Sequence, residues 1–223
     1  MSRPRLVVFD CDGTLVDSQH TICTAMDNVF GEAGLAVPGA DRIRRIVGLS
    51  LVEAVAALIP ESGTDLHEKV VDLYKAQFHK LVDAEQAPEP LYPGVRVALE
   101  ALAAAGYAMG VATGKSRRGL LRVLARHDLE GYFSTLQTAD NALSKPHPQM
   151  MLQAMSDTGA SPRDTIMVGD TSFDMAMARA AKTAAVGVAW GYHEPDELVA
   201  HGACEVIDSY GDLLPLVTRM MEN

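Results

Sequence analysis

The chain has 223 residues, of which 48% are hydrophobic and 22% are charged, as in an ordinary globular protein. Its formal charge of −10 argues against nucleic acid or an anionic membrane as the main partner, although local cations would still admit a small anionic substrate. No signal-peptide pattern or membrane-length apolar run is present, and the three scattered cysteines favour reduced thiols over a disulfide framework. These features predict a cytoplasmic protein.

The first predicted element is a buried parallel strand, a continuous apolar run that begins at Leu6 and leads into Asp10-Cys11-Asp12-Gly13. Ligands of open α/β sheets bind beyond the carboxyl ends of strands, so Asp10 and Asp12 lie where such folds do chemistry. Two neighbouring carboxylates repel each other unless a cation, a shared proton or a strong donor holds them. The pair therefore indicates a metal, and it allows one carboxylate to act as nucleophile and the other as proton donor.

Residues 16–91 do not continue the strand pattern and instead predict a run of helices. The expected helices cover about 18–33, 41–47, 51–58 and 65–84. Pro88, Pro90, Pro93 and Gly94 then form a stiff junction. A helical insertion that begins and ends beside the Asp10 turn is naturally a lid. We therefore expect an α/β core of residues 1–15 and 92–223, with residues 16–91 as a helical cap.

Beyond residue 92, predicted strands and helices alternate. Strands are expected over 107–112, 133–137, 165–168, 184–189 and around 206, and helices over 94–105, 116–127, 148–157, from about 171 to 181, and at the C-terminus. This alternation predicts a parallel sheet that is covered by helices on both faces.

Further polar groups follow these predicted strands, at positions that converge on one edge of the sheet. Thr113 and Gly114 offer a hydroxyl and free backbone N–H groups at a helix N-terminus, which suits a phosphate. Lys145 lies in a loop that prolines stiffen, and Asp170 and Asp174 follow the strand at 165–168. Such all-oxygen ligation with few carboxylates is what Mg²⁺ prefers.

These motifs, in this order, resemble those of the haloacid dehalogenase-like hydrolase superfamily. The resemblance rests on the segment 10–18, Thr113, Lys145-Pro146, and Gly169-Asp170 with Asp174, and it spans the whole chain. The segments 188–192, 202–203 and 206–207 resemble the phosphoglycolate phosphatase-like branch. The resemblance implies a three-layer, Rossmann-like parallel sheet core with an inserted all-helical cap.

The resemblance also implies a mechanism. Asp10 would attack phosphorus to give an aspartyl-phosphate, and Asp12 would protonate the leaving oxygen and later deprotonate water. Mg²⁺ would be held by Asp10, the Asp12 backbone carbonyl and Asp170, with Asp174 helping. The groups expected to bind the phosphoryl oxygens are Gly13, Thr113, Gly114 and Lys145.

Several functional alternatives remain open. Asp12 favours phosphate esters over the dehalogenases, which lack this second aspartate. A phosphonatase-like enzyme would need a Schiff-base lysine in the cap, whereas Lys69, Lys75 and Lys80 are better explained as solvated. The best single substrate is 2-phosphoglycolate; the alternatives are a sugar-phosphate mutase of the β-phosphoglucomutase type and a non-catalytic phosphometabolite-binding protein. The protein is expected to be a monomer or a homodimer.

The cap is expected to carry substrate selectivity, because it closes over the substrate. Arg44, Arg45 and the glycine turn 47–50 are the cap elements most suited to face the site, with Arg45 and Gly48 as the leading candidates. An arginine there would bind a carboxylate such as that of 2-phosphoglycolate, or would simply be a surface charge. Lys115 and Arg117 either add to the field around the phosphate or solubilise their helix.

Overall fold

The structure is a computed structural model that describes residues 3–222, except for the side chain of Asp83. Its described residues contain one six-stranded sheet in the order β3-β2-β1-β4-β5-β6, in which all neighbouring strands are parallel. The strands are β1 Leu6–Phe9, β2 Ala108–Ala112, β3 Thr135–Gln137, β4 Thr165–Gly169, β5 Ala184–Val188 and β6 Glu205–Ile207. This is the strand order of a Rossmann-like fold, which is the fold class expected from the sequence.

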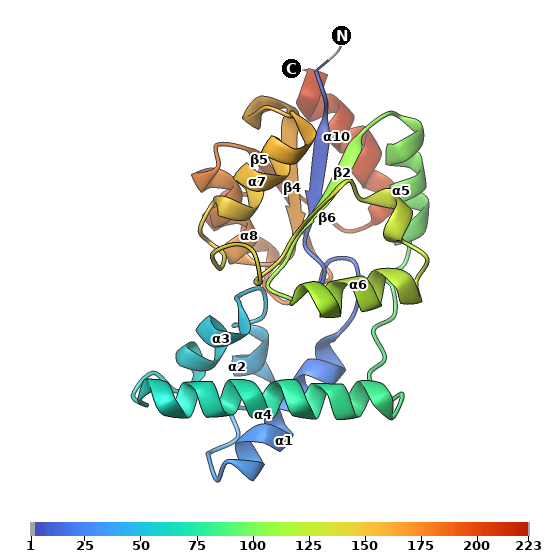
Figure 1. The fold of residues 1–223 in the computed structure, drawn as a ribbon. Helices are drawn as coiled ribbons and strands as arrows, with labels where there is room; N and C mark the ends of the chain where they lie inside the picture. Colours follow the sequence, from blue (N-terminus) through green and yellow to red (C-terminus); the bar gives the residue numbers. More distant parts are fainter. Residues whose placement is uncertain (1–2, 223) are drawn as a thin grey trace.

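Helices cover both faces of the sheet, so the core has three layers (Figure 1). One face packs against α5 (Val95–Ala104), α6 (Arg117–Arg126) and α10 (Leu213–Glu222). The other packs against α7 (Gln149–Thr158), α8 (Ser172–Ala180) and α9 (Pro195–His201). Side chains of β1 alternate between the two apolar clusters, with Val7 and Phe9 in the first and Leu6 and Val8 in the second. The continuous apolar run of β1 is therefore buried on both sides.

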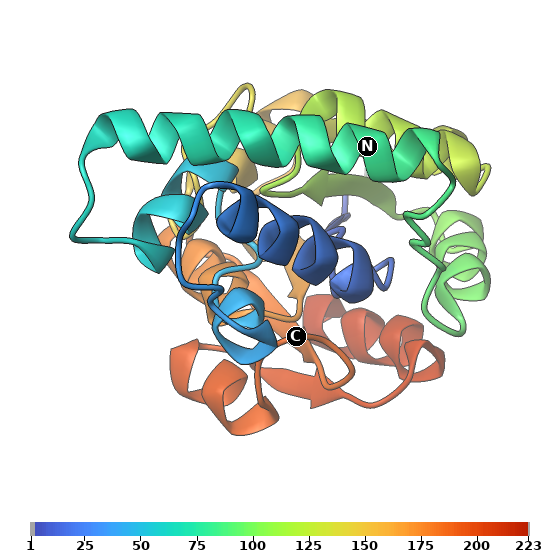
Figure 2. The same cartoon turned by 90° about the horizontal axis from the view of Figure 1, so that it is seen from below.

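The segment between β1 and α5 folds as a separate layer of helices below the carboxyl ends of the strands, at the end of the molecule opposite the chain termini (Figure 1). It consists of α1 (Gln19–Glu32), α2 (Ala40–Arg44), α3 (Leu51–Leu58) and α4 (Thr64–Asp83). These helices share an apolar cluster of their own, which includes Met26, Phe30 and Val55. Seen from below, the long helix α4 lies beside α1 (Figure 2). We call this helical layer the cap.

Two linkers join the cap to the sheet, and they are hydrogen-bonded to each other. Asp17 N donates to Pro90 O at 2.9 Å, and Tyr92 N donates to Leu15 O at 3.0 Å. Val16 and Leu91 form an antiparallel bridge between these two contacts. The cap therefore leaves and re-enters the core through a short paired ribbon beside the end of β1.

Most predicted elements match the observed ones to within a few residues. Ser116 caps α6 as expected, because its side chain accepts a hydrogen bond from Gly119 N. The short helix α9 was not predicted, although Pro195 stands at its first turn. Among the described residues, no helix combines the length and the apolar character needed to cross a membrane.

Candidate active site

The pairing of β1 with β4 places their polar ends side by side. Phe9 is in register with Val168, and Asp10 N donates to Val168 O at 2.9 Å. Asp10 and Asp170 each follow their strand at the same edge of the sheet. Successive strands are added on one side of β1 up to β3 and on its other side from β4, and open α/β sheets form their binding crevice at such a switch between β1 and β4. The sheet thus delivers two carboxylates into the expected site.

Lys145 joins Asp10 to Asp174. Its Nζ lies 2.9 Å from Asp10 Oδ2 and 2.6 Å from Asp174 Oδ1, and all three side chains are buried. Asp174 in turn forms a capping box with Thr171, whose hydroxyl lies 2.7 Å from Asp174 Oδ2. Asp174 is therefore held by the start of α8, and it holds Lys145 against Asp10.

Burial and charge act in opposite directions on these groups. Burial raises the pKa of Asp10 to about 7, although the Lys145 ammonium partly offsets this effect. Burial also raises the pKa of Asp170 well above its usual range, and the nearby Asp10 carboxylate adds to the effect. For Lys145 burial alone would lower the pKa, but attraction to Asp10 and Asp174 raises it overall. The lysine stays charged, whereas the carboxylates are left short of positive charge.

The donor set fits a divalent cation. One carboxylate oxygen from each of Asp10, Asp170 and Asp174 lies within 4.8 Å of the others, and all three residues are buried. Oδ2 of Asp10 faces Lys145 but accepts no hydrogen bond of good geometry from the described part of the chain. Buried carboxylates that are close together need a counter-charge, and hard oxygen ligands suit Mg²⁺. These residues could therefore hold Mg²⁺. Asp10 and Asp170 are the more available ligands, because Asp174 already contacts both Lys145 and Thr171.

Asp170 is oriented from two sides. Thr14 Oγ1 donates to its Oδ1 at 2.7 Å, and Tyr192 N donates to its Oδ2 at 2.9 Å. Gly13, with a φ of +79°, runs so close that an added Cβ would lie 2.1 Å from Asp170 Oδ2 and 2.5 Å from the Tyr192 ring. The glycine predicted at this turn is thus required by close packing as well as by its backbone conformation.

Asp12 has a separate set of partners. Ser18 Oγ donates to its Oδ1 at 2.5 Å, and Lys115 Nζ lies 2.9 Å from the same oxygen. Lys115 also contacts Glu89 Oε1 at 3.2 Å. Burial alone would lower the pKa of Lys115, but attraction to Asp12 and Glu89 raises it overall. The two aspartates of the first turn therefore face different lysines.

A cavity of about 810 Å³ lies between the sheet edge and the cap. Asp10, Asp12, Thr113 and Gly114 line it from the core. The cap side is mostly apolar, with lining residues Ile22, Met26, Leu51, Val52, Ala54, Val71, Tyr74, Phe78 and Val82. Lys145, Asp170 and Asp174 are buried and are not among its lining residues in the described chain.

The glycine turn of the cap makes the closest approach to the core. Gly48 lines the cavity with a φ of +101°, and Leu49 O would lie 2.2 Å from a Cβ added to Gly114. Ser50 N donates to Ser144 Oγ at 2.8 Å in the loop that carries Lys145. The structure thus brings Gly48 to the site, together with Thr113 and Gly114.

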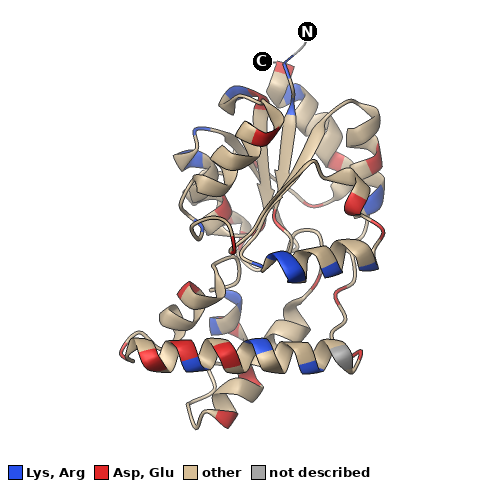
Figure 3. Ribbon diagram, in the orientation of Figure 1, with Lys and Arg blue, Asp and Glu red and all other residues tan. Residues whose placement is uncertain are grey.

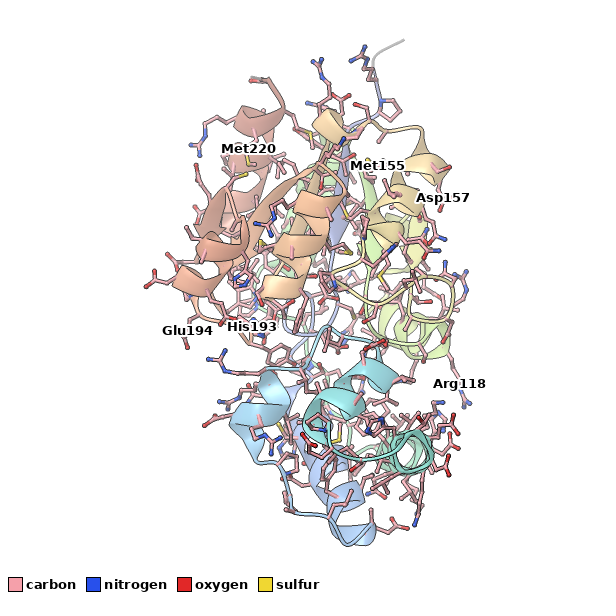
Figure 4. All side chains as sticks on the ribbon, turned by 90° about the vertical axis from the view of Figure 1, so that its left-hand side faces the viewer. Arg118, Met155, Asp157, His193, Glu194 and Met220 are labelled. Carbon is pink, nitrogen blue, oxygen red and sulfur yellow. The ribbon has the colours of Figure 1, made fainter. Side chains whose placement is uncertain are left out.

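Arg45 is placed elsewhere. Its Nη1 lies 3.2 Å from Glu197 Oε2, its side chain is 67% exposed, and it is not among the described residues that line the cavity. Glu197 also contacts His193 at 3.3 Å, at the level where the core meets the cap (Figure 4). Arg45 therefore joins cap to core on the outside of the molecule. It does not face the substrate site, contrary to the prediction from the sequence.

The cations that do line the cavity come mainly from α6 and α4. Helix α6 presents a row of Arg residues near the cap (Figure 3). Arg118 lines the cavity and extends from α6 towards the side on which α4 lies (Figure 4). Lys75, His79, Lys115 and Arg122 also contribute to its walls. Asp10, Asp12 and Asp140 line the same walls, so these cations supply positive charge beside acidic groups, where a phosphate substrate requires it.

Sequence reasoning missed Ser18, Glu89 and Tyr192 as parts of the site and left Lys115 undecided. Glu89 carried a usable signal, because it is an acidic residue between two prolines in the linker. Lys115 directly follows the predicted phosphate-binding residues Thr113 and Gly114. The direction of its side chain depends on the path of the second cap linker, which carries Glu89. The role of Ser18 follows only from the turn that brings it back to Asp12.

Comparison with known proteins agrees with this geometry. The family model described as haloacid dehalogenase-like hydrolase matches residues 7–188. The chain belongs to this family. The matched region runs from β1 to the end of β5 and so covers most of the sequence.

Curated relatives of this haloacid dehalogenase-like hydrolase are named phosphatases. The chain is 39% identical over 215 residues to the "Probable phosphatase IndB" of Dickeya dadantii (strain 3937), covering 94% of this chain and 91% of the relative. It is 30% identical over 224 residues to "Phosphoglycolate phosphatase 1" of Pseudomonas aeruginosa, covering 98% of this chain and 82% of the relative. The protein is a phosphatase that acts on a small phosphate substrate.

Solved structures of the family share the fold. A haloacid dehalogenase-like family hydrolase from Streptococcus pneumoniae superimposes with a TM-score of 0.83 at 25% identity, covering 97% of this chain and 99% of that one. Because the match extends over nearly both whole chains, the sheet and the cap are shared together.

Proposed function

We propose that this phosphatase is a Mg²⁺-dependent phosphomonoester hydrolase of the cytoplasm that works through an aspartyl-phosphate on Asp10. The observation that carries the proposal is the buried contact of Asp10 with Lys145 beside Asp170 and Asp174. It supplies a nucleophile at the cavity wall, a fixed cation and a carboxylate set suited to a metal. A non-catalytic binding protein would have no need of Asp12, because binding alone requires no proton transfer.

In the proposed first step an Asp10 oxygen attacks phosphorus, and the bond from phosphorus to the leaving oxygen breaks. Asp12 gives its proton to that oxygen. In the second step a water molecule gives a proton to Asp12 and attacks phosphorus, and the bond to Asp10 breaks. Inorganic phosphate leaves, and both aspartates return to their starting states.

The surrounding groups would hold the transferred phosphoryl group. Thr113 and Gly114 line the cavity, and the Lys145 ammonium lies 2.9 Å from Asp10 Oδ2. Donors placed in this way stabilise the charge that develops on the equatorial oxygens. Mg²⁺ would neutralise phosphoryl charge in the same place. The groups that would hold it are Asp10, Asp170, the Asp12 carbonyl and, directly or through its contacts, Asp174.

For the substrate we propose a small phosphorylated metabolite, with 2-phosphoglycolate as the first candidate. The name of the Pseudomonas aeruginosa relative supports this choice. The cationic residues of the cavity, Arg118 and Lys75 among them, offer partners for a carboxylate in place of Arg45. The cavity volume of about 810 Å³ leaves room for larger monoesters as well, so a substrate panel should include them.

The test is a panel of phosphomonoesters assayed with purified protein and Mg²⁺, reporting kcat/KM for each. We expect phosphate release from several monoesters, with a phosphorylated enzyme trapped during turnover. Asp10→Asn should abolish both turnover and the phosphoenzyme, whereas Asp12→Ala should slow both steps. A panel without any hydrolysis, or an Asp10→Asn variant of near-normal activity, would overturn the proposal.

The same assay separates a hydrolase from a mutase. A mutase must protect its aspartyl-phosphate from water and present it to a second sugar hydroxyl. Rapid release of phosphate from p-nitrophenyl phosphate, with no sugar bisphosphate added, is the expected result for a hydrolase. Release that requires a sugar bisphosphate would favour the β-phosphoglucomutase type of reaction instead.

A further inference from the structure

Lys115 occupies a position between two buried carboxylates that belong to different parts of the molecule. Its Nζ lies 2.9 Å from Asp12 Oδ1 in the first turn and 3.2 Å from Glu89 Oε1 in the second cap linker. The side chains of Lys115 and Asp12 are about one-tenth exposed, and that of Glu89 is fully buried. A charge this well enclosed is weakly screened by solvent, so both contacts act at close range.

The second linker is fastened to α6 at several points around Glu89. Arg122 of α6 pairs with Glu89 Oε2, and Arg126 donates to Ala87 O at 2.9 Å. The His127 ring nitrogen lies 2.7 Å from the backbone oxygen of Glu89. Helix α6 therefore fixes the path of the linker, and Lys115 stands just before the start of that helix.

Lys115 is not needed merely to neutralise Glu89, because Arg122 already contacts its other carboxylate oxygen. The four groups Asp12, Glu89, Lys115 and Arg122 carry two negative and two positive charges. Of the two cations in this set, Lys115 is the one that contacts Asp12. It therefore connects Glu89 of the second cap linker to the first turn. Removing it would leave Asp12 with Ser18 as its remaining side-chain partner in the described chain.

We propose that Lys115 is a positioning residue that holds the acid–base carboxylate of Asp12 and couples it to the cap through Glu89. The inference rests on the proposed function, because it assigns to Asp12 the proton transfers described above. Lys115 keeps its own proton throughout. As Asp12 gives its proton to the leaving oxygen, the ammonium stabilises the carboxylate that results, and it holds that carboxylate in place to accept the proton of water.

The proposal predicts an effect that depends on the leaving group. The value of kcat/KM reports the steps up to departure of the leaving group, and a weakly basic leaving group needs little help from an acid. Phenyl phosphate and p-nitrophenyl phosphate have similar size, but phenolate is the more basic leaving group. In Lys115→Met we expect kcat/KM to fall roughly tenfold more for phenyl phosphate than for p-nitrophenyl phosphate.

Two further variants separate positioning from a structural role. Lys115→Arg keeps the charge and should restore most of the ratio between the two substrates. Arg117→Met removes a cation from the exposed first turn of the same helix and should leave the ratio unchanged. A change limited to protein stability would lower both activities together and would not move the ratio.

A double-mutant cycle tests the connection to the linker. Glu89→Gln should shift the same substrate ratio in the same direction, and its effect should largely disappear in the Lys115→Met background. Should the two effects simply add, Glu89 does not act through Lys115 and the coupling to the cap is refuted. Lys115→Arg and Glu89→Gln keep the test decisive even where Lys115→Met folds poorly.

The outcomes also distinguish this inference from the proposed function. Wild-type protein that hydrolyses neither aryl phosphate refutes the proposed function, and the inference with it. Wild-type protein that hydrolyses both, combined with equal losses for both in Lys115→Met, refutes the role of Lys115 alone. An altered ratio in Lys115→Met that Lys115→Arg reverses supports it.

Discussion

Lys145 and Asp174 form a fully buried ion pair, with 2.6 Å between Nζ and Oδ1. Asp174 is itself fixed by Thr171 at the start of α8, so the lysine is held from behind while it faces Asp10. This arrangement makes Lys145 a structural counter-charge for buried acids, and in the proposed mechanism it is also a catalytic residue beside Asp10.

Replacement of Lys145 should therefore affect stability and activity together. In Lys145→Met the carboxylates of Asp10 and Asp174 lose their shared cation, and breaking such buried pairs costs about 3–5 kcal/mol. We expect a lower Tm and a loss of kcat of at least about a thousandfold, since the variant also loses charge stabilisation at the phosphoryl group. Calorimetry and steady-state kinetics measure the two effects; an active, stable variant would contradict this assignment.

Mg²⁺ should stabilise the folded protein in the absence of any substrate. A ligand that binds only the native state raises stability according to its concentration over its Kd. We expect the Tm to rise with added Mg²⁺, to fall back with EDTA, and to stay constant in Asp170→Asn. A Tm of the wild type that does not respond to millimolar Mg²⁺ would speak against a metal held by the Asp10, Asp170 and Asp174 set.

The metal-free protein should lose stability as the pH rises from about 4 to about 7. Burial raises the pKa of Asp10 from 3.8 to about 7, so in this range the native state retains a proton that the unfolded chain has released. Stability therefore falls with pH across this window, by an amount on the order of a few kcal/mol for a group shifted this far. Urea unfolding in EDTA should show the slope in the wild type and a smaller one in Asp10→Asn, where the raised pKa of Asp170 preserves part of it.

Gly114→Ala should impair activity by pushing the cap turn away from the core. The added Cβ would lie 2.2 Å from Leu49 O and 2.8 Å from Gly48 O, distances that require the turn to move. We expect kcat/KM to fall by about tenfold or more, as misplacement of a closing element commonly does. Gly131→Ala is the matched control, because its Cβ would meet no atom within 4 Å. Equal kinetics for the two variants would show that this contact is dispensable.

Arg45→Ala should leave substrate binding nearly unchanged. Its guanidinium pairs with Glu197 at the exterior, and exposed pairs of this kind contribute about 0–1 kcal/mol. We expect the KM for the best carboxylate-bearing monoester to stay within about twofold of the wild type, whereas a loss of one charge-assisted contact would raise it about tenfold or more. An increase of that size would return Arg45 to the substrate site.

The fold was predictable because its strongest signals are local. Continuous apolar runs such as Leu6–Phe9 mark buried strands, and the helical segment between residues 16 and 91 interrupts the alternation visibly. The order of the strands was not predictable, because it depends on pairings between residues far apart in the chain. The meeting of Asp10 with Asp170 could still be expected, since the carboxyl ends of parallel strands lie along one edge.

Side-chain direction set the limit of prediction within the site. Arg45 and Lys115 are both cations beside glycine turns, and the sequence gives no means of telling which one turns inward. Lys115 lies between Asp12 and Glu89 and contacts both carboxylates. Arg45 instead pairs with Glu197. In each case an acidic residue distant in the chain decides the outcome.

The paired ribbon at residues 15–17 and 90–92 has a consequence for the architecture of the enzyme. Because the two ends of the inserted segment are hydrogen-bonded to each other, the segment leaves the sheet and returns to it at a single place. The sheet needs nothing from the inserted helices to close its own backbone bonding. The insertion is thus joined to the sheet at one place, and we expect a different helical segment grafted at that place to lie against the same Asp10 turn.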